Sequence, residues 1–108
     1  MLLPSNAYVE TKAAIGDPDK VDMVLRRILN SRLLKKAEED LAQCYRDIRT
    51  SIKASVKIEL GSLRSNLEYQ IEFLNRESIW MDEQINSWLE TAPLVVRKTY
   101  ELLIKNHG

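Results

Sequence analysis

Residues 41–74 read LAQCYRDIRTSIKASVKIELGSLRSNLEYQIEFL, and an unbroken series of apolar side chains runs through them. Successive members are three or four residues apart, so nine steps cover 33 residues, or about 3.7 residues a step. This is the period of an α-helix with one apolar face. We call the series the apolar ladder, and it comprises Leu41, Tyr45, Ile48, Ile52, Val56, Leu60, Leu63, Leu67, Ile71 and Leu74. From Tyr45 onward, we expect its members to form a core or an oligomer interface.

Composition places the chain in the all-α class. Of its 108 residues, 44% are hydrophobic and 30% are charged, and it contains three glycines and three prolines. No proline lies between Pro18 and Pro93, so nothing forbids helix there. We expect long antiparallel amphipathic helices, as in a helical bundle or coiled coil. Residues 1–16 are predicted to be an N-terminal arm or a short helix, and residues 17–108 a single helical domain.

Helix ends can be placed from local chemistry. Asp17 and Pro18 are a capping residue followed by a first-turn proline, which predicts a shorter N-terminal helix from about residue 18. Counting back along the ladder, the apolar pattern fails at Asn30, so residues 30–31 mark either a turn or a phase slip within a bent helix, and a short break is favoured. Beyond the ladder the pattern continues to about Glu90. Pro93 then begins a last helix, which we expect to fold back antiparallel on the preceding turns.

Gly61 leaves two arrangements open for residues 34–90. It is either the tip of a helical hairpin or an interior residue of one continuous helix, roughly 80 Å long at ~1.5 Å per residue. The ladder keeps its phase across Gly61, and this favours the continuous helix. Such a helix cannot bury its apolar face alone, so it predicts an antiparallel dimer, two-fold about Gly61.

Charge is unevenly distributed although the net charge is zero. Residues 20–57 contain ten Lys or Arg and five Asp or Glu, whereas residues 58–92 contain two and seven. We expect the basic half to face the acidic half of a neighbouring helix. The alternative is a nucleic-acid-associated protein that tracks a phosphate backbone. Its candidate basic stripe, with helical spacing beside the ladder, is Arg46, Arg49, Lys53 and Lys57.

Ile79, Trp80 and Met81 are consecutive apolar residues that no single helical face can bury, and Trp88 follows Trp80 by two turns. Tryptophan is enriched at interface hot spots. Ile79, Trp80 and Trp88 are therefore a candidate partner patch. Alternatively, the last helix or a sister chain covers these tryptophans, and that alternative is favoured because the last helix has apolar residues to spare.

No catalytic, cofactor or metal signature is present. Glu68 and Glu72 are flanked at four-residue spacing by Arg64 and Arg76, which predicts an exposed salt ladder instead of an acid–base pair. Cys44 is the single cysteine, which suits a reducing, cytoplasmic compartment, and beside the ladder it is predicted to be a small buried hydrophobe.

We therefore expect a non-enzymatic protein–protein interaction module: an oligomerising adaptor, an assembly subunit or a small regulator. Its partners would be proteins, with the chain acting as a homodimer or as a subunit of a larger assembly. No stretch approaches the ~20 apolar residues of a membrane span, and no membrane association is predicted.

Overall fold

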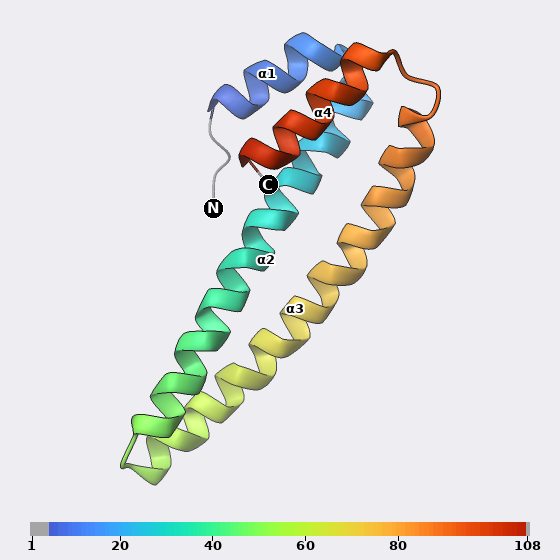
Figure 1. Ribbon diagram of the computed structural model, residues 1–108. Helices are drawn as coiled ribbons and strands as arrows, with labels where there is room; N and C mark the ends of the chain where they lie inside the picture. Colours follow the sequence, from blue (N-terminus) through green and yellow to red (C-terminus); the bar gives the residue numbers. More distant parts are fainter. Residues whose placement is uncertain (1–4, 108) are drawn as a thin grey trace.

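A computed structural model describes residues 5–107 of the chain, with side chains from Tyr8 onward. Within this range the chain forms four helices and no strand, which confirms the all-α prediction (Figure 1). The helices are α1 (Ser5–Ile15), α2 (Pro18–Thr50), α3 (Ala54–Leu89) and α4 (Leu94–His107). Helices α2 and α3 form a long antiparallel hairpin, and α1 and α4 lie against one end of it.

The start of α2 follows the local chemistry of the sequence. Gly16 ends α1 in the left-handed region at φ 79°, where glycine has no steric penalty. Asp17 then caps α2, and its Oδ1 accepts a hydrogen bond from the backbone N–H of Asp19 at 3.1 Å. Pro18 occupies the first turn, where its missing N–H costs nothing. The predicted helix start near residue 18 is therefore confirmed.

The turn between α2 and α3 lies at residues 51–53, so the predicted continuous helix from residue 34 to 90 is wrong. Ser51 and Lys53 both have extended backbone dihedrals. Hydroxyl groups compete with the helix here, since Thr50 Oγ1 donates to the carbonyl of Arg46 and Ser51 Oγ to that of Lys53. The ladder keeps its phase through this turn by coincidence of spacing.

Gly61 lies inside α3 with no positive φ, so it is not the tip of the hairpin either. The alternative prediction of a helical hairpin was correct, but its turn lies at residues 51–53 and not at Gly61. A two-fold dimer axis at Gly61 also loses its basis, because the two halves of the ladder now face each other within one chain.

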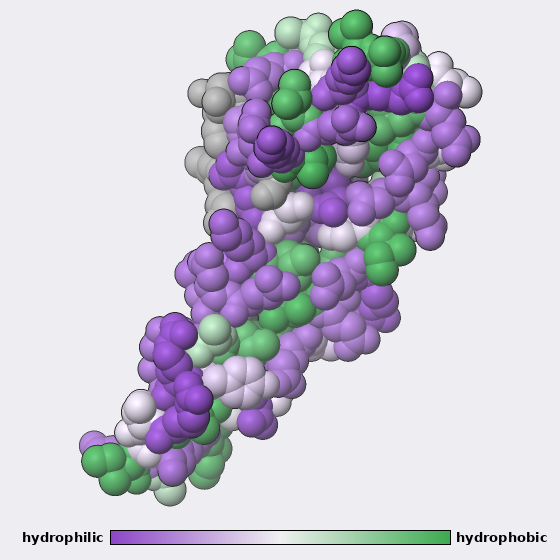
Figure 2. All heavy atoms as spheres, viewed as in Figure 1, coloured by the Kyte–Doolittle hydropathy of each residue, from purple (hydrophilic) through white to green (hydrophobic). Residues whose placement is uncertain are grey.

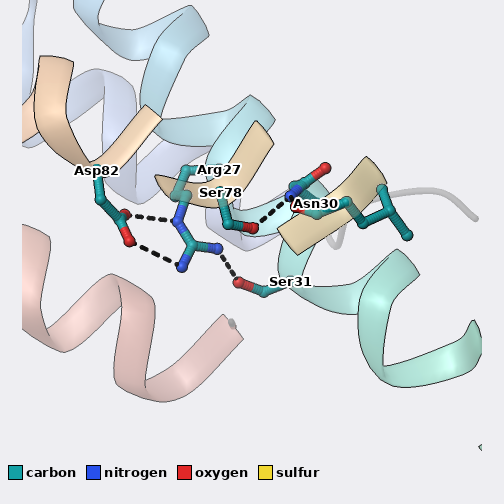
Figure 3. A network of polar contacts seen from close by, with 6 residues as sticks. Arg27, Asn30, Ser31, Ser78 and Asp82 are labelled. Atoms are coloured by element: carbon teal, nitrogen blue, oxygen red, sulfur yellow. Dashed lines mark hydrogen bonds and ion pairs between the residues drawn. The ribbon is translucent and has the colours of Figure 1, made fainter. Parts of the chain in front are cut away.

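Asn30 does not interrupt α2, which is a single helix of 33 residues, so the predicted break at residues 30–31 is wrong. The amide Nδ2 of Asn30 donates to the hydroxyl of Ser78 at 2.5 Å and to the carbonyl of Leu74 at 2.9 Å, across the hairpin (Figure 3). Asn30 and Ser78 are both buried. Asn30 and Ser78 interrupt the apolar patterns of α2 and α3, and each is the other's hydrogen-bond partner in the core.

Helix α4 begins near the predicted position, but it packs mainly on α1 and α2 and not back along α3. Its Leu103 joins Val24 and Ile28 of α2 in a buried cluster, against which Ile15, Trp88, Tyr100 and Ile104 pack. The last residue of α4, His107, places its Nε2 3.2 Å from Glu10 Oε2, and its carbonyl accepts from Arg32 Nε at 2.7 Å. Helices α1, α2 and α4 are thus tied together at this end, which we call the head.

Burial decreases along the hairpin away from the head. The molecule is elongated, with extents of 57 × 25 × 18 Å (Figure 1). In the single chain none of residues 45–66, all of them described, is buried. Only two helices meet there, so each apolar side chain is covered from one side. The far end of the hairpin is therefore poorly covered by its own chain.

Candidate interaction surfaces

The turn at residues 51–53 divides the apolar ladder into unequal parts. Leu67 and Leu74 are buried between the helices, and Leu41, Ile48, Leu60 and Ile71 are half-buried. Tyr45, Ile52, Val56 and Leu63 are exposed in the single chain. The ladder is thus an intrachain core only toward the head. That its exposed members meet a second chain stays a prediction.

The candidate patch of Ile79, Trp80 and Trp88 is not brought together on one face. Trp88 packs against the head cluster, and the Lys20 ammonium lies 5.5 Å from the centre of its ring. Ile79 and Trp80 are exposed on α3, and α4 does not cover them. Eight residues along an α-helix exceed two full turns by about 80°, enough to separate the two tryptophans.

A different set of side chains lines the outer side of α3. Tyr69, Phe73 and Trp80 are 68%, 48% and 53% exposed, and Arg76 lies among them at helical spacing. These four residues, which we call the aromatic face, lie opposite the side of α3 that buries Leu67, Leu74 and Ile85. Sequence reasoning missed Tyr69 and Phe73 because it followed the ladder. Their 4-3-4 spacing with Arg76 and Trp80 was the available signal.

The salt ladder beside this face is formed as its spacing predicts. Arg64 lies 4.0 Å from Glu68, and Arg76 lies 3.6 Å from Glu72, with all four side chains well exposed. Tyr45 of α2 donates its hydroxyl to Glu68 Oε1 at 2.7 Å, and this hydrogen bond raises the pKa of Tyr45. These carboxylates are engaged in ion pairs and hydrogen bonds on an open surface, where charge pairs contribute little.

A second polar group links α2 and α3 near the head (Figure 3). Arg27 binds Asp82 through two hydrogen bonds, with Nε–Oδ1 at 2.7 Å and Nη2–Oδ2 at 3.3 Å, and its Nη1 donates to Ser31. Burial raises the pKa of nearby Tyr100 to about 12, and the Asp82 carboxylate adds to this shift. Together with Asn30 and Ser78, this pair fixes the register of the hairpin.

Cys44 is buried as predicted, and its thiol donates to the carbonyl of Leu60 at 3.1 Å. This contact ties the C-terminal part of α2 to the N-terminal part of α3. The thiol therefore has a packing role in the hairpin.

The predicted basic stripe is not one helical face. Arg46 and Arg49 lie in the last turns of α2, Lys53 in the turn and Lys57 in the first turn of α3. All four are exposed and gather at the far end of the hairpin. Ile52, the residue at the turn, is 96% exposed, and Ile58 is 74% exposed. Residues 46–58 are hereafter the hairpin tip, where Figure 2 shows hydrophobic surface beside hydrophilic surface.

Comparison of the chain with protein-family models, with curated proteins and with solved structures found no match. Within the described residues, no three His, Cys, Asp or Glu side chains are grouped so that they could hold a metal ion. None of the four described helices has the length and apolar content needed to cross a bilayer. The function must therefore be inferred from the exposed surfaces, namely the aromatic face and the hairpin tip.

Proposed function

We propose that this chain is a non-enzymatic helical interaction module that associates with a second copy of itself through the aromatic face of α3. The observation that carries the proposal is the exposure of Tyr69, Phe73 and Trp80 on the side of α3 opposite the core. None of these side chains belongs to the buried cluster of the head. Large aromatic residues gathered on one face are typical of interface hot spots.

The spacing of the aromatic face supports a second copy as the occupant. Tyr69, Phe73, Arg76 and Trp80 are separated by four, three and four residues, a pattern that is unchanged when it is read backwards. In an antiparallel pair of α3 helices, Tyr69 would then lie opposite Trp80 of the second copy. Phe73 would lie opposite Arg76 of the second copy, and an arginine over an aromatic ring is attractive.

The area available predicts a weak dimer. A fully buried aromatic side chain removes roughly 150–250 Å² from water, and about half of that remains accessible here. Three such residues from each of two chains give on the order of 450–750 Å². Flanking residues bring the interface toward the ~1,000 Å² at which specific association begins. We therefore expect a dissociation constant in the micromolar range.

Sedimentation equilibrium at micromolar concentrations tests the proposal. The wild-type chain should dimerise, and Phe73→Ser and Trp80→Ser should each shift the equilibrium toward monomer at least tenfold. Tyr8→Ser is the matched control, since Tyr8 is 49% exposed on α1, away from this face. A wild-type monomer at these concentrations, or equal weakening by the Tyr8 variant, would contradict the proposal.

The antiparallel register has its own test. In a Cys44→Ala background, chains carrying Tyr69→Cys and chains carrying Trp80→Cys should form a mixed disulfide faster than either variant forms one alone. This expectation follows because the register places these two positions opposite each other. Equal rates in the mixed and separate samples would exclude this arrangement.

A further inference from the structure

The hairpin tip combines two features that the proposed dimer does not use. The first is aliphatic exposure at the end of the molecule remote from the head, where Ile52 is 96% and Ile58 74% exposed. Ile52 lies in the three-residue turn itself, so it protrudes from a convex end and not from a groove. A protruding aliphatic residue fits a soft apolar phase better than it fits a rigid protein surface, which would need a matching cavity.

The second feature is uncompensated positive charge. Residues 46–57 contain four Lys or Arg and one acidic residue, Asp47, in a chain whose net charge is zero. Asp47 is engaged by Gln43, whose Nε2 donates to its Oδ1 at 2.8 Å. Among the described residues, the side chains of Arg49, Lys53 and Lys57 form no ion pair. Within the described part of the chain, Lys53 and Lys57 are thus unpaired cations directly adjacent in sequence to the exposed Ile52 and Ile58.

We propose that the hairpin tip docks onto a bilayer surface that carries anionic lipid headgroups. Ile52 enters the boundary between headgroups and acyl chains, and Arg49, Lys53 and Lys57 contact the anionic headgroups. Apolar side chains flanked by cations are the combination that binds such surfaces. The contact is shallow and peripheral, and it requires no helix that crosses the bilayer. It departs from the sequence-based expectation of no membrane association, which considered only membrane-spanning segments.

The same cations would attract nucleic acid, but the apolar residues favour lipid. An isoleucine gains nothing against a hydrated phosphate backbone, and single strands are held by aromatic stacking. The aromatic residue nearest in sequence to the tip, Tyr45, already donates its hydroxyl to Glu68 at 2.7 Å. Replacing Ile52 should therefore weaken binding to lipid but not binding to nucleic acid.

The expected effects follow from burial and charge. Withdrawing one isoleucine side chain from an apolar phase lowers the partition coefficient roughly 10- to 100-fold. Removing one cation close to an anionic surface lowers it about fivefold. Ile52→Ser should thus have a larger effect than Lys53→Gln. Neither change should affect folding, because both side chains are exposed in the hairpin.

The test is cosedimentation of the full chain with phosphatidylcholine vesicles, with and without phosphatidylserine. We expect binding that requires phosphatidylserine, that falls with salt, and that Ile52→Ser reduces at least tenfold. Val95→Ser is the matched control, because Val95 is an exposed apolar residue of α4 at the head. Circular dichroism confirms that each variant is folded.

Three results would overturn the proposal: no binding to the phosphatidylserine vesicles, equal binding by the Ile52→Ser variant, or binding to a DNA or RNA duplex that exceeds binding to vesicles. Phe73→Ser should leave vesicle binding intact, and Ile52→Ser should leave the dimer intact. Failure of the lipid contact is therefore distinguishable from failure of the proposed dimer.

Discussion

Replacing Asn30 by alanine removes one side of the buried polar contact between α2 and α3. Its amide donates to the Ser78 hydroxyl at 2.5 Å and to the Leu74 carbonyl at 2.9 Å. Each such bond contributes a net ~0.5–1.5 kcal/mol, and leaving the buried Ser78 hydroxyl without a partner costs a further ~1–3 kcal/mol. That hydroxyl can turn to the carbonyl one turn earlier in its own helix, which reduces the second amount. We therefore expect Asn30→Ala to lower the free energy of unfolding by ~2–4 kcal/mol.

Urea unfolding followed by circular dichroism measures this loss, and a double substitution isolates its cause. In Asn30→Leu/Ser78→Ala neither polar partner remains buried, so the stability should return to within ~1 kcal/mol of the wild type. Asn75→Ala is the control on the exposed side of α3, with an expected change within ~0.5 kcal/mol. A single-variant loss below ~0.5 kcal/mol would refute the reasoning, as would a double variant with the summed loss of its two single changes.

Three further predictions concern the hairpin and the head. Gly61→Ala should raise the free energy of unfolding by ~0.5–1 kcal/mol, because beyond its sequence neighbours and its own helix backbone no atom lies within 4 Å of the added methyl carbon, and alanine favours helix. A loss of stability in the same urea assay would show that Gly61 is not an ordinary helical residue. Leu74→Ala should cost ~2–5 kcal/mol, whereas Ile52→Ala should change stability by less than ~0.5 kcal/mol because Ile52 is 96% exposed. Equal effects of these two changes would contradict the burial gradient along the hairpin. Since burial raises the pKa of Tyr100 to about 12 from an ordinary 10, the folded state holds this proton while the unfolded state releases it between about pH 10 and 12. The wild type should therefore lose stability relative to Tyr100→Phe as pH rises through that interval, and parallel stability curves would exclude the shift.

Local chemistry predicted the ends of helices, while contacts between distant residues did not follow from it. The cap at Asp17 and the boundary near Pro93 depend on residues adjacent in sequence, so they could be read directly. Asn30 appeared to break a helix because a polar residue at a position where the helical pattern requires an apolar one indicates the end of that pattern. Its partner Ser78 lies 48 residues away, and only the folded hairpin brings the two together.

The turn at residues 51–53 escaped prediction for a related reason. It contains neither glycine nor proline, and the apolar ladder continues through it in phase. The hydroxyls of Thr50 and Ser51 were the available signal, and they are weak turn formers compared with Gly61. The position of α4 depends on α1, which the sequence left open as an arm or a short helix. The spacing of the aromatic face was visible in the sequence, but the apolar ladder on the opposite side of α3 was the stronger pattern and was followed instead.

Stability and interaction depend on different surfaces of this molecule. The buried cluster, the Arg27–Asp82 pair and the Asn30–Ser78 contact all lie in the half of the hairpin near the head, where three or four helices meet. The residues that carry the two proposals are exposed by different amounts: Phe73 and Trp80 are about half exposed on one surface, and Ile52 is almost fully exposed on the other. Substitutions on these surfaces should therefore change binding more than they change the unfolding free energy, whereas substitutions of the buried contacts should change both together.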